Sequence, residues 1–223
     1  MKENKHFETR KVLTAEFEYL KKTYVEELFK TGAVVVRGQD EEPFKLRSGG
    51  ESYIYVDHAK VGTSRNGFVA MISSIHYVVS QEVGVIDSVM NVDSKLSAQL
   101  TGAYSALFGI DMIVFKGEGL LVAERGTKKQ LTGGGESVVI LDDVGTSGRT
   151  IVEASSILKD SAKVKNIFAV VGLVREPKIF RKNLLKENIE SFFVVTLDDV
   201  LQQNFNRFNS SQKQSILKER EIS

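Results

Sequence analysis

The amino-acid sequence predicts an α/β protein with a central, mostly parallel sheet flanked by helices. Short apolar strand patterns alternate with amphipathic helix patterns along most of the chain, as in parallel strands joined by crossover helices. The run Val138–Leu141 has four apolar residues, which is typical of a strand buried on both faces. A short polar turn follows it and leads into a helix pattern that contains Ile151 and Leu158.

The chain length of 223 residues suits one domain, or one domain with a small addition. We expect a single domain over residues 1–223, in which residues 1–60 supply most of a small hood over the strand ends. Residues from about 61 to 200 form the core, and residues 201–223 form a polar, helical tail.

The composition excludes several kinds of site. The net charge is +1, so nothing electrostatic favours binding to nucleic acid or to an acidic membrane surface. The absence of cysteine excludes disulfides, thiolate metal sites and cysteine nucleophiles. His6, His58 and His76 are too scattered in the sequence to suggest a metal cluster. Met1–Arg10 lacks a signal core and no apolar run reaches membrane-spanning length, so we expect a soluble cytoplasmic protein.

The N-terminal part of the chain predicts a helix, a strand and a hairpin. The helix covers Thr14–Thr31, has apolar residues at helical spacing and stops at Gly32. The strand Ala33–Arg37 follows. Phe44–Arg47 and Tyr53–Asp57 are predicted to be the two arms of a β-hairpin.

The rest of the chain alternates between helices and strands. Ser64–Gln81 is predicted to be a helix with Ser64 as its N-cap, and another helix covers about Leu96–Phe108. Further strands are predicted at Val85–Val89, Asp111–Phe115, Leu120–Glu124, Asn166–Leu173 and Phe192–Thr196.

The stretch Val138–Thr150 carries the clearest chemistry in the sequence. Two carboxylates, Asp142 and Asp143, close the strand before a turn of small and hydroxyl residues. Unpaired backbone N–H groups at a helix start bind phosphate, glycines allow close approach, and hydroxyl groups donate to phosphate oxygens. The carboxylates suit sugar hydroxyls, or water on a magnesium ion. A ribose 5-phosphate combines both features.

All thirteen residues of this stretch resemble the signature that binds 5-phosphoribosyl diphosphate (PRPP) in type I phosphoribosyltransferases. The resemblance implies the type I phosphoribosyltransferase fold. It implies that Asp142 and Asp143 are catalytic, fix the ribose diol and hold Mg²⁺ through water. It also implies that the residues after them bind PRPP: Val144, Gly145, Thr146, Ser147, Gly148 and Thr150. The alternative is a generic α/β turn with an acidic strand end.

A second stretch resembles orotate phosphoribosyltransferases, which carry the pattern F-x-L-(K/R)-S-G-x-x-S followed by extended aromatic residues. The matching residues here are Phe44, Leu46, Arg47, Ser48, Gly49 and Ser52. The resemblance implies that Arg47 contacts the phosphates of PRPP and that Tyr55 lies beside the base. The alternative is an ordinary surface hairpin with a solvated arginine.

Three basic positions are matched more loosely. Lys95 follows a strand end at which the family binds pyrophosphate, although the usual glycine and proline are absent, and it is equally compatible with a surface lysine. Lys116–Glu136 occupies the place of a mobile basic loop that closes over the neighbouring subunit in the family. Lys116 and Lys128 are its catalytic candidates. Because the family's basic motif is absent, a hairpin with a solvated tip is the alternative.

Arg175 follows the strand Asn166–Leu173, where the orotate enzymes place an arginine against the carboxylate of orotate. A guanidinium fork suits that contact. Val174 stands where the family often has aspartate. The resemblance adds Thr146 and Tyr55 to the base-binding set.

The predicted function is therefore phosphoribosyl transfer from PRPP to orotate, with Mg²⁺ as cofactor, pyrophosphate as the second product and a homodimer as the assembly. Neither a nucleic acid nor a membrane is expected as a partner. Two alternatives stay open: a phosphoribosyltransferase for another base such as a purine, and a non-catalytic regulator that senses PRPP or a nucleotide on the same fold.

Overall fold

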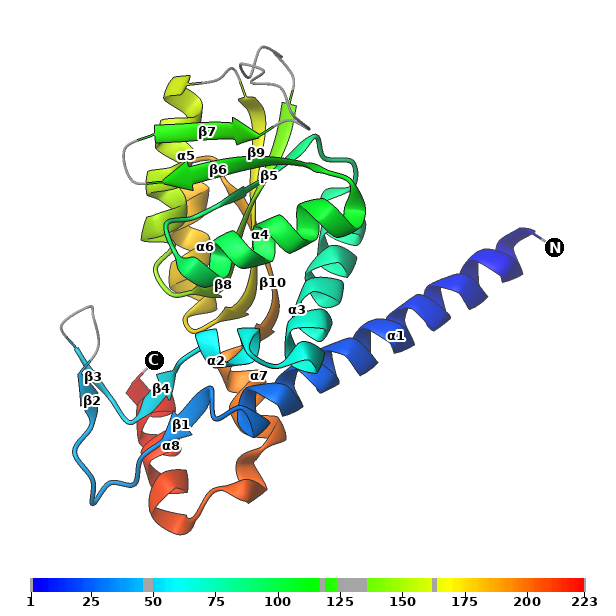
Figure 1. The fold of residues 1–223 in the computed structure, drawn as a ribbon. Helices are drawn as coiled ribbons and strands as arrows, with labels where there is room; N and C mark the ends of the chain where they lie inside the picture. The colour runs from blue at the N-terminus through cyan, green and yellow to red at the C-terminus, as the bar shows by residue number, and fades with distance from the viewer. Residues whose placement is uncertain (1, 46–49, 117–118, 124–135, 162–163, 223) are drawn as a thin grey trace.

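A computed structural model of the chain describes residues 2–45, 50–116, 119–123, 136–161 and 164–222. Its centre is a six-stranded sheet with the order β10-β9-β8-β5-β6-β7 (Figure 1). Neighbouring strands from β10 to β6 are parallel, and β7 is antiparallel to β6 at one edge. The strands are β5 (Ser88–Asn91), β6 (Asp111–Lys116), β7 (Gly119–Ala123), β8 (Glu136–Gly145), β9 (Val164–Val174) and β10 (Glu190–Thr196).

Helices cover both faces of this sheet. The helices of the core and of the N-terminal region are α1 (Lys2–Lys30), α2 (Ala59–Gly62), α3 (Arg65–Val78), α4 (Lys95–Phe108), α5 (Arg149–Ser161) and α6 (Pro177–Lys186), and a π-helical turn, η1 (Val79–Val83), extends α3. Val139 and Leu141 of β8 share a core with α1, α3 and α4. Val138 and Ile140 of the same strand share a second core with α5 and α6. The apolar run is therefore buried on both faces, as predicted.

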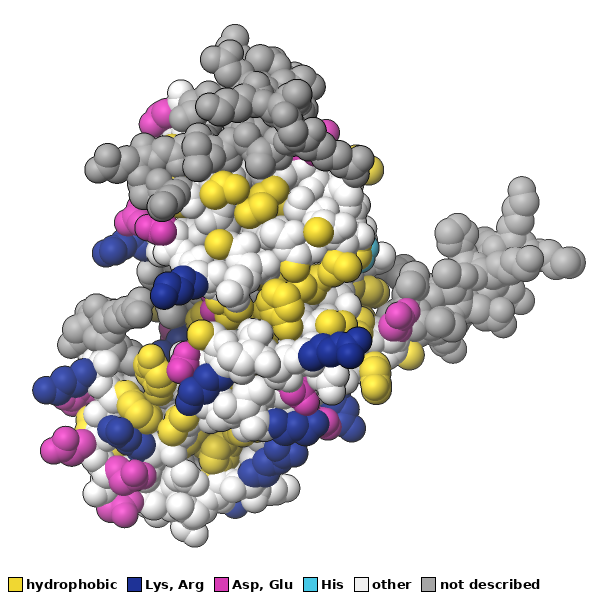
Figure 2. All heavy atoms as spheres, in the orientation of Figure 1, with side chains coloured by type: hydrophobic (Ala, Val, Ile, Leu, Met, Phe, Trp, Pro, Cys, Tyr) yellow, Lys and Arg dark blue, Asp and Glu magenta, His cyan; other side chains and the backbone are white. Residues whose placement is uncertain are grey.

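The remaining elements form a smaller layer beyond the carboxyl ends of the strands (Figure 1). They are β1 (Val34–Val36), β2 (Phe44–Lys45), β3 (Glu51–Ser52), β4 (Ile54–Val56), α7 (Leu197–Gln203), η2 (Phe205–Arg207) and α8 (Ser210–Ile222). We call β1 to β4 together with α8 the hood. Gln212 Nε2 of α8 donates to Val36 O at 2.7 Å, which ties the C-terminal helix to β1. Lysine and arginine side chains gather mainly over the hood half of the face in Figure 2.

The predicted hairpin is only partly correct. β2 pairs antiparallel with β3, so a hairpin forms, but β3 (Glu51–Ser52) precedes the predicted arm Tyr53–Asp57, and β4 within that arm pairs with β1. The physical reason is burial, because opposite Val36 the side chain of Ile54 is only 2% exposed. A β-branched partner distant in the sequence therefore takes this strand.

The strand predicted at Val85–Val89 is displaced toward the C-terminus. It runs from Ser88 to Asn91, and Val85 is 92% exposed. Asn91 is tolerated inside the sheet because its side chain is paired. Its Oδ1 accepts from Phe115 N at 2.9 Å, and its Nδ2 donates to Phe115 O at 2.9 Å. A buried amide with such partners costs little.

The other element predictions are confirmed within the described residues. The first helix begins earlier than predicted and ends at Lys30, just before Gly32, which has a φ of 67°. Ser64 caps α3 by accepting from Gly67 N at 3.2 Å. No helix among the described residues combines the length and apolar character needed to cross a membrane.

Candidate functional site

The acid pair lies inside the last residues of β8. Sequence reasoning ends the strand at Leu141, but β8 pairs with β9 as far as Gly145, opposite Val174. This extension is possible because the end of β9 is an apolar, buried partner. The polar turn shortens to 146–148, and α5 begins at Arg149, which places Thr150 in its first turn. The carboxylates, the turn and the helix start thus follow one another at the carboxyl edge of the parallel sheet.

Packing against α6 requires a glycine at Gly145, the last residue of β8, and at Gly148 in the turn. A Cβ on Gly145 would lie 2.7 Å from the Phe180 ring, and one on Gly148 would lie 3.0 Å from Leu184. Gly148 also has a φ of 78°, which disfavours other residues. We expected these glycines to allow close approach to a ligand. The structure adds that they allow the turn to lie directly on a helix.

The hydroxyl side of the turn is open to solvent. Thr146, Ser147 and Thr150 are exposed, and Val144 is half-buried. Asn183 Nδ2 of α6 donates to Ser147 O at 3.0 Å and so fixes the backbone of the turn without using its hydroxyl group. Free hydroxyls around the N-terminus of a thirteen-residue helix are a suitable arrangement for a phosphate.

Asp142 and Asp143 differ in their electrostatics. Asp142 is 6% exposed, and its Oδ1 accepts from Asp143 N at 2.9 Å. Burial, together with the negative charge of Asp143, raises the pKa of Asp142 well above its usual value. Burial also opposes ionisation of Asp143, but contact with His58, together with hydrogen bonding to Asp142 and to the backbone, outweighs it and lowers the pKa of Asp143. Asp143 is therefore the carboxylate that carries the charge of the pair.

Sequence reasoning missed the residues behind Asp143. His58 Nδ1 lies 3.3 Å from Asp143 Oδ2, and the Tyr24 hydroxyl is hydrogen-bonded to His58 Nε2. Tyr24 and His58 are 0% and 3% exposed. Tyr24 is part of the apolar stripe of α1, and no local pattern connects either residue with β8. Only the fold places them together.

Arg175 connects the core with the hood. Its backbone N donates to Gly145 O at 2.8 Å, and its Nη2 donates to Ile54 O at 3.2 Å and lies 3.4 Å from Ser52 Oγ. Burial lowers the pKa of Arg175, although the charges of Glu219 and Glu176 oppose this shift. Arg175 thus joins the end of β8 through its backbone and the hood strands through its guanidinium.

No contact with the acid pair is found for the other predicted site residues that the structure describes, Tyr55 and Lys95. Tyr55 follows the Arg175 contact in β4, is 40% exposed, and its ring centroid lies 5.3 Å from that of Phe44. Lys95 is exposed at the first residue of α4. The same helix start touches the site strand, because Ser97 Oγ donates to Leu141 O at 2.6 Å.

Some predicted residues cannot be placed. Arg47 and Lys128 lie outside the described residues, and for Lys116 only the backbone, at the end of β6, is described. Among the described residues, no group of three or more His, Asp or Glu side chains forms a cage for a metal ion.

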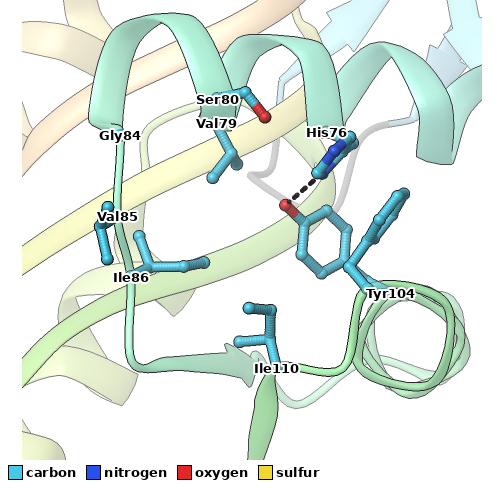
Figure 3. A pocket seen from close by; sticks show the side chains of 9 residues that line it. His76, Val79, Ser80, Gly84, Val85, Ile86, Tyr104 and Ile110 are labelled. Carbon is cyan, nitrogen blue, oxygen red and sulfur yellow. Dashed lines mark hydrogen bonds between the residues drawn. The ribbon is translucent and has the colours of Figure 1, made fainter.

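A cavity of about 230 Å³ lies at the end of the sheet opposite to the acid pair (Figure 3). It is bordered by Ile86 and Ile110, which precede β5 and β6, and so lies at the amino ends of the parallel strands. There His76 Nδ1 lies 3.1 Å from the Tyr104 hydroxyl. This cavity is separate from the acid pair.

Known proteins resemble the chain in sequence and in fold. No family model matches the chain. An orotate phosphoribosyltransferase from Methanococcus maripaludis is 28% identical over 161 residues, which are 70% of this chain and 83% of that protein. The crystal structure of orotate phosphoribosyltransferase from Aeropyrum pernix superposes with a TM-score of 0.65 at 20% identity, covering 81% of this chain and 98% of that one.

A further solved structure is the orotate phosphoribosyltransferase of Mycobacterium tuberculosis H37Rv in complex with PRPP. Its TM-score is 0.59 at 17% identity, over 81% of this chain and 98% of that chain. The chain therefore has the type I phosphoribosyltransferase fold, and the proteins that it resembles in sequence and in structure are orotate phosphoribosyltransferases.

Proposed function

We propose that the protein transfers ribose 5-phosphate from PRPP to orotate, giving orotidine 5-phosphate and pyrophosphate for pyrimidine nucleotide synthesis. The observation that carries the proposal is the sequence of groups at the end of β8. A charged and a buried carboxyl group stand next to an open hydroxyl turn that enters α5. The similarity to orotate phosphoribosyltransferases supports this choice of base.

The reaction needs no protein nucleophile. A ring nitrogen of orotate bonds to the anomeric carbon while the bond from that carbon to the diphosphate oxygen breaks. Positive charge develops on the sugar and negative charge on the leaving pyrophosphate. The ionised Asp143 beside the ribose diol stabilises the former, and the N-terminus of α5 with its hydroxyls holds the 5-phosphate. Arg175, whose Nη2 donates to Ile54 O in the hood, would bind the orotate carboxylate.

We propose Mg²⁺ as the cofactor. Two adjacent carboxyl groups supply the oxygen ligands that Mg²⁺ prefers. The described residues form no cage for the ion. This fits binding of Mg²⁺ through water and through the substrate diphosphate, as is usual for this ion. When bound, Mg²⁺ neutralises charge on the diphosphate.

We also propose that the protein acts as a cytoplasmic homodimer in which Lys116 and Lys128 of the basic segment 116–136 act at the neighbouring site, while residues 119–123 of this segment form β7 in the chain's own sheet. Arg47 and Lys95 would contact the phosphates of PRPP. The resemblance to the orotate enzymes supports these assignments. A cytoplasmic location suits substrates that are small, water-soluble anions.

A base panel tests the proposed function. The protein is incubated with PRPP, Mg²⁺ and one of orotate, uracil, adenine, guanine or hypoxanthine, and pyrophosphate release is measured. Release with orotate alone supports the proposal, and release with a purine alone replaces it by a purine enzyme. PRPP binding without release for any base would identify a regulator.

The acid pair provides the matched variant. We expect Asp142→Asn combined with Asp143→Asn to abolish orotate turnover, because the charge beside the sugar is lost. Circular dichroism and thermal unfolding should show an intact fold, since asparagine preserves the shape of both side chains. Unchanged turnover would exclude the acid pair from the mechanism.

A further inference from the structure

A buried chain of three polar side chains runs from α1 to the acid pair. Tyr24 of α1 contacts His58, which follows β4, and His58 faces Asp143 of β8. Within the described residues, the buried His58 Nδ1 has no hydrogen bond of good geometry, and Asp143 Oδ2 lies 3.3 Å away. Buried polar groups are costly without partners, so this arrangement is unlike an ordinary apolar core contact.

The chemistry of the three groups fixes where their protons lie. An ionised carboxylate only accepts hydrogen bonds, so the His58 nitrogen that faces Asp143 carries the proton. In the neutral ring, Nε2 then accepts from the Tyr24 hydroxyl. Burial and the negative charge of Asp143 raise the pKa of Tyr24 well above its usual value, so this hydroxyl retains its proton. With the His58 ring in its neutral form, each donor of the chain therefore points toward Asp143.

A separate observation shows that the fold leaves room for this chain. Gly172 lies in β9 beside it, and a Cβ there would lie 2.6 Å from the Tyr24 hydroxyl oxygen. The same Cβ would lie 3.1 Å from the carbonyl oxygen of Asp143 and 3.4 Å from Cε1 of His58. A glycine inside a central strand usually marks the close approach of another group. Here that group is the polar chain.

We propose that His58, held by Tyr24, is a positioning residue that fixes the Asp143 carboxylate for the ribose diol of PRPP. With Oδ2 directed at the His58 ring, the carboxylate cannot rotate freely, and its side chain keeps 15% of its surface exposed. Precise placement of a carboxylate against a developing positive charge contributes to catalysis because no reorganisation is needed in the transition state. This inference rests on the proposed function.

Two substitutions at His58 separate the two ends of the ring. In His58→Asn, the side-chain amide takes the place of Nδ1 and can still donate to Asp143. In His58→Gln, the longer side chain takes the place of Nε2, so contact with Tyr24 is kept and contact with Asp143 is lost. We expect His58→Gln to lower kcat/KM for PRPP by about tenfold or more, because a contact to a charged group is removed. His58→Asn should stay within about threefold of the wild type.

A purely structural role predicts a different pattern. Both variants break one end of the chain, so both would lower the melting temperature and leave the kinetic constants alike. The matched control is His76→Gln, which disturbs a second His–Tyr pair at the opposite edge of the sheet. We expect this variant to lose stability with kcat and both KM values unchanged.

The test measures kcat, KM for PRPP, KM for orotate and melting temperature for the wild type and the three variants. A selective loss in His58→Gln, confined to kcat and the KM for PRPP, supports the positioning role. Equal kinetics for His58→Gln and His58→Asn overturn it while leaving the proposed function intact. If the wild type turns over no base, the proposed function fails by itself. PRPP affinity, measured calorimetrically, then decides the positioning role, with weaker binding expected only for His58→Gln.

Discussion

Gly172 shows how polar groups from neighbouring elements can determine the residue type at one position of a central strand. Residues Ala169–Val174 of strand β9 are otherwise apolar and buried, and an alanine would normally improve the strand. The missing Cβ instead provides the space occupied by the Tyr24 hydroxyl. The identity of this residue is therefore determined by polar groups from α1 and β8 and not by the strand itself.

We expect Gly172→Ala to destabilise the protein by roughly 1–3 kcal/mol, because the new methyl group overlaps the Tyr24 hydroxyl. Adding Tyr24→Phe removes the atom that it meets, so the double variant should be more stable than Gly172→Ala alone. Thermal or denaturant unfolding of the four proteins in the double-mutant cycle measures this coupling. Strictly additive effects would show that the overlap is not the cause.

His58 also marks the limit of sequence reasoning for single residues. Asp142, Asp143 and the turn after them are contiguous, so their joint chemistry is visible in the sequence. His58 and Asp143 are far apart in the chain and share no periodicity with each other. Their contact depends on how the segment after β4 packs against β8, which no local pattern encodes.

The N-terminus of α3 is linked to the end of α1. The Ser64 hydroxyl accepts from Gly67 N at 3.2 Å and donates to Glu27 Oε2 at 2.5 Å, which links the cap of α3 to α1. The hydrogen bonds from Ser64 and Lys30 lower the pKa of Glu27. Glu27 is 6% exposed, so this carboxylate depends on its partners. The start of α3 and the end of α1 are thus held by one shared interaction.

We expect Ser64→Ala to lower stability by about 1 kcal/mol or more, which corresponds to a melting temperature lower by roughly 2–4 °C. A depressed pKa in the folded state stabilises the protein above the unfolded pKa, and that contribution is lost as the pH falls through the folded pKa. The difference between wild type and variant should therefore be larger at neutral pH than in acid.

Ser94→Ala is the matched control for this prediction. Ser94 caps α4 by accepting from Ser97 N at 3.1 Å. Within the described residues, no carboxylate is hydrogen-bonded to Ser94. Its removal should cost a similar amount at each pH at which the wild type unfolds reversibly. An equal pH dependence in both variants would argue against the role of Glu27.

The same distinction explains which elements the sequence predicts well. Strand β8 and helix α5 are encoded by an apolar run and a helical period that lie next to each other in the chain. In contrast, β5 contains Ser88 and Asn91, and its position depends on hydrogen bonds to β6. β4 pairs with β1 through burial of Ile54. Strand patterns do not contain such partner choices.

Across the whole molecule, Glu219 connects α8 to the segment between β3 and β4 of the hood. Its Oε2 accepts from Ser52 Oγ at 2.9 Å, its Oε1 accepts from Tyr53 N, and its charge lies near Arg175. Sequence reasoning assigned no chemistry to this polar tail. Glu219 is far from Ser52 and Tyr53 in the sequence, but it holds the segment that leads into β4. The Ile54 carbonyl of β4 accepts a hydrogen bond from Arg175.

We expect Glu219→Ala to raise the KM for orotate by about tenfold while changing the KM for PRPP little, because the hood strand and Arg175 lose a charged partner. Steady-state kinetics with each substrate varied in turn measure this difference. Gln214→Ala, at an exposed position of the same helix, is the control and should behave as the wild type. A rise in both KM values would instead indicate a general loss of the fold.

The hydrogen bond between Ser52 and Glu219 joins partners 167 positions apart in the chain. During synthesis on the ribosome, the parallel sheet can assemble before α8 emerges. Until then, β3 and β4 lack their hydrogen bonds to Glu219. Closing so long a loop is entropically unfavourable and is offset only when the core already holds both ends near each other. The sheet that carries the acid pair can therefore form before Glu219 holds the hood strands.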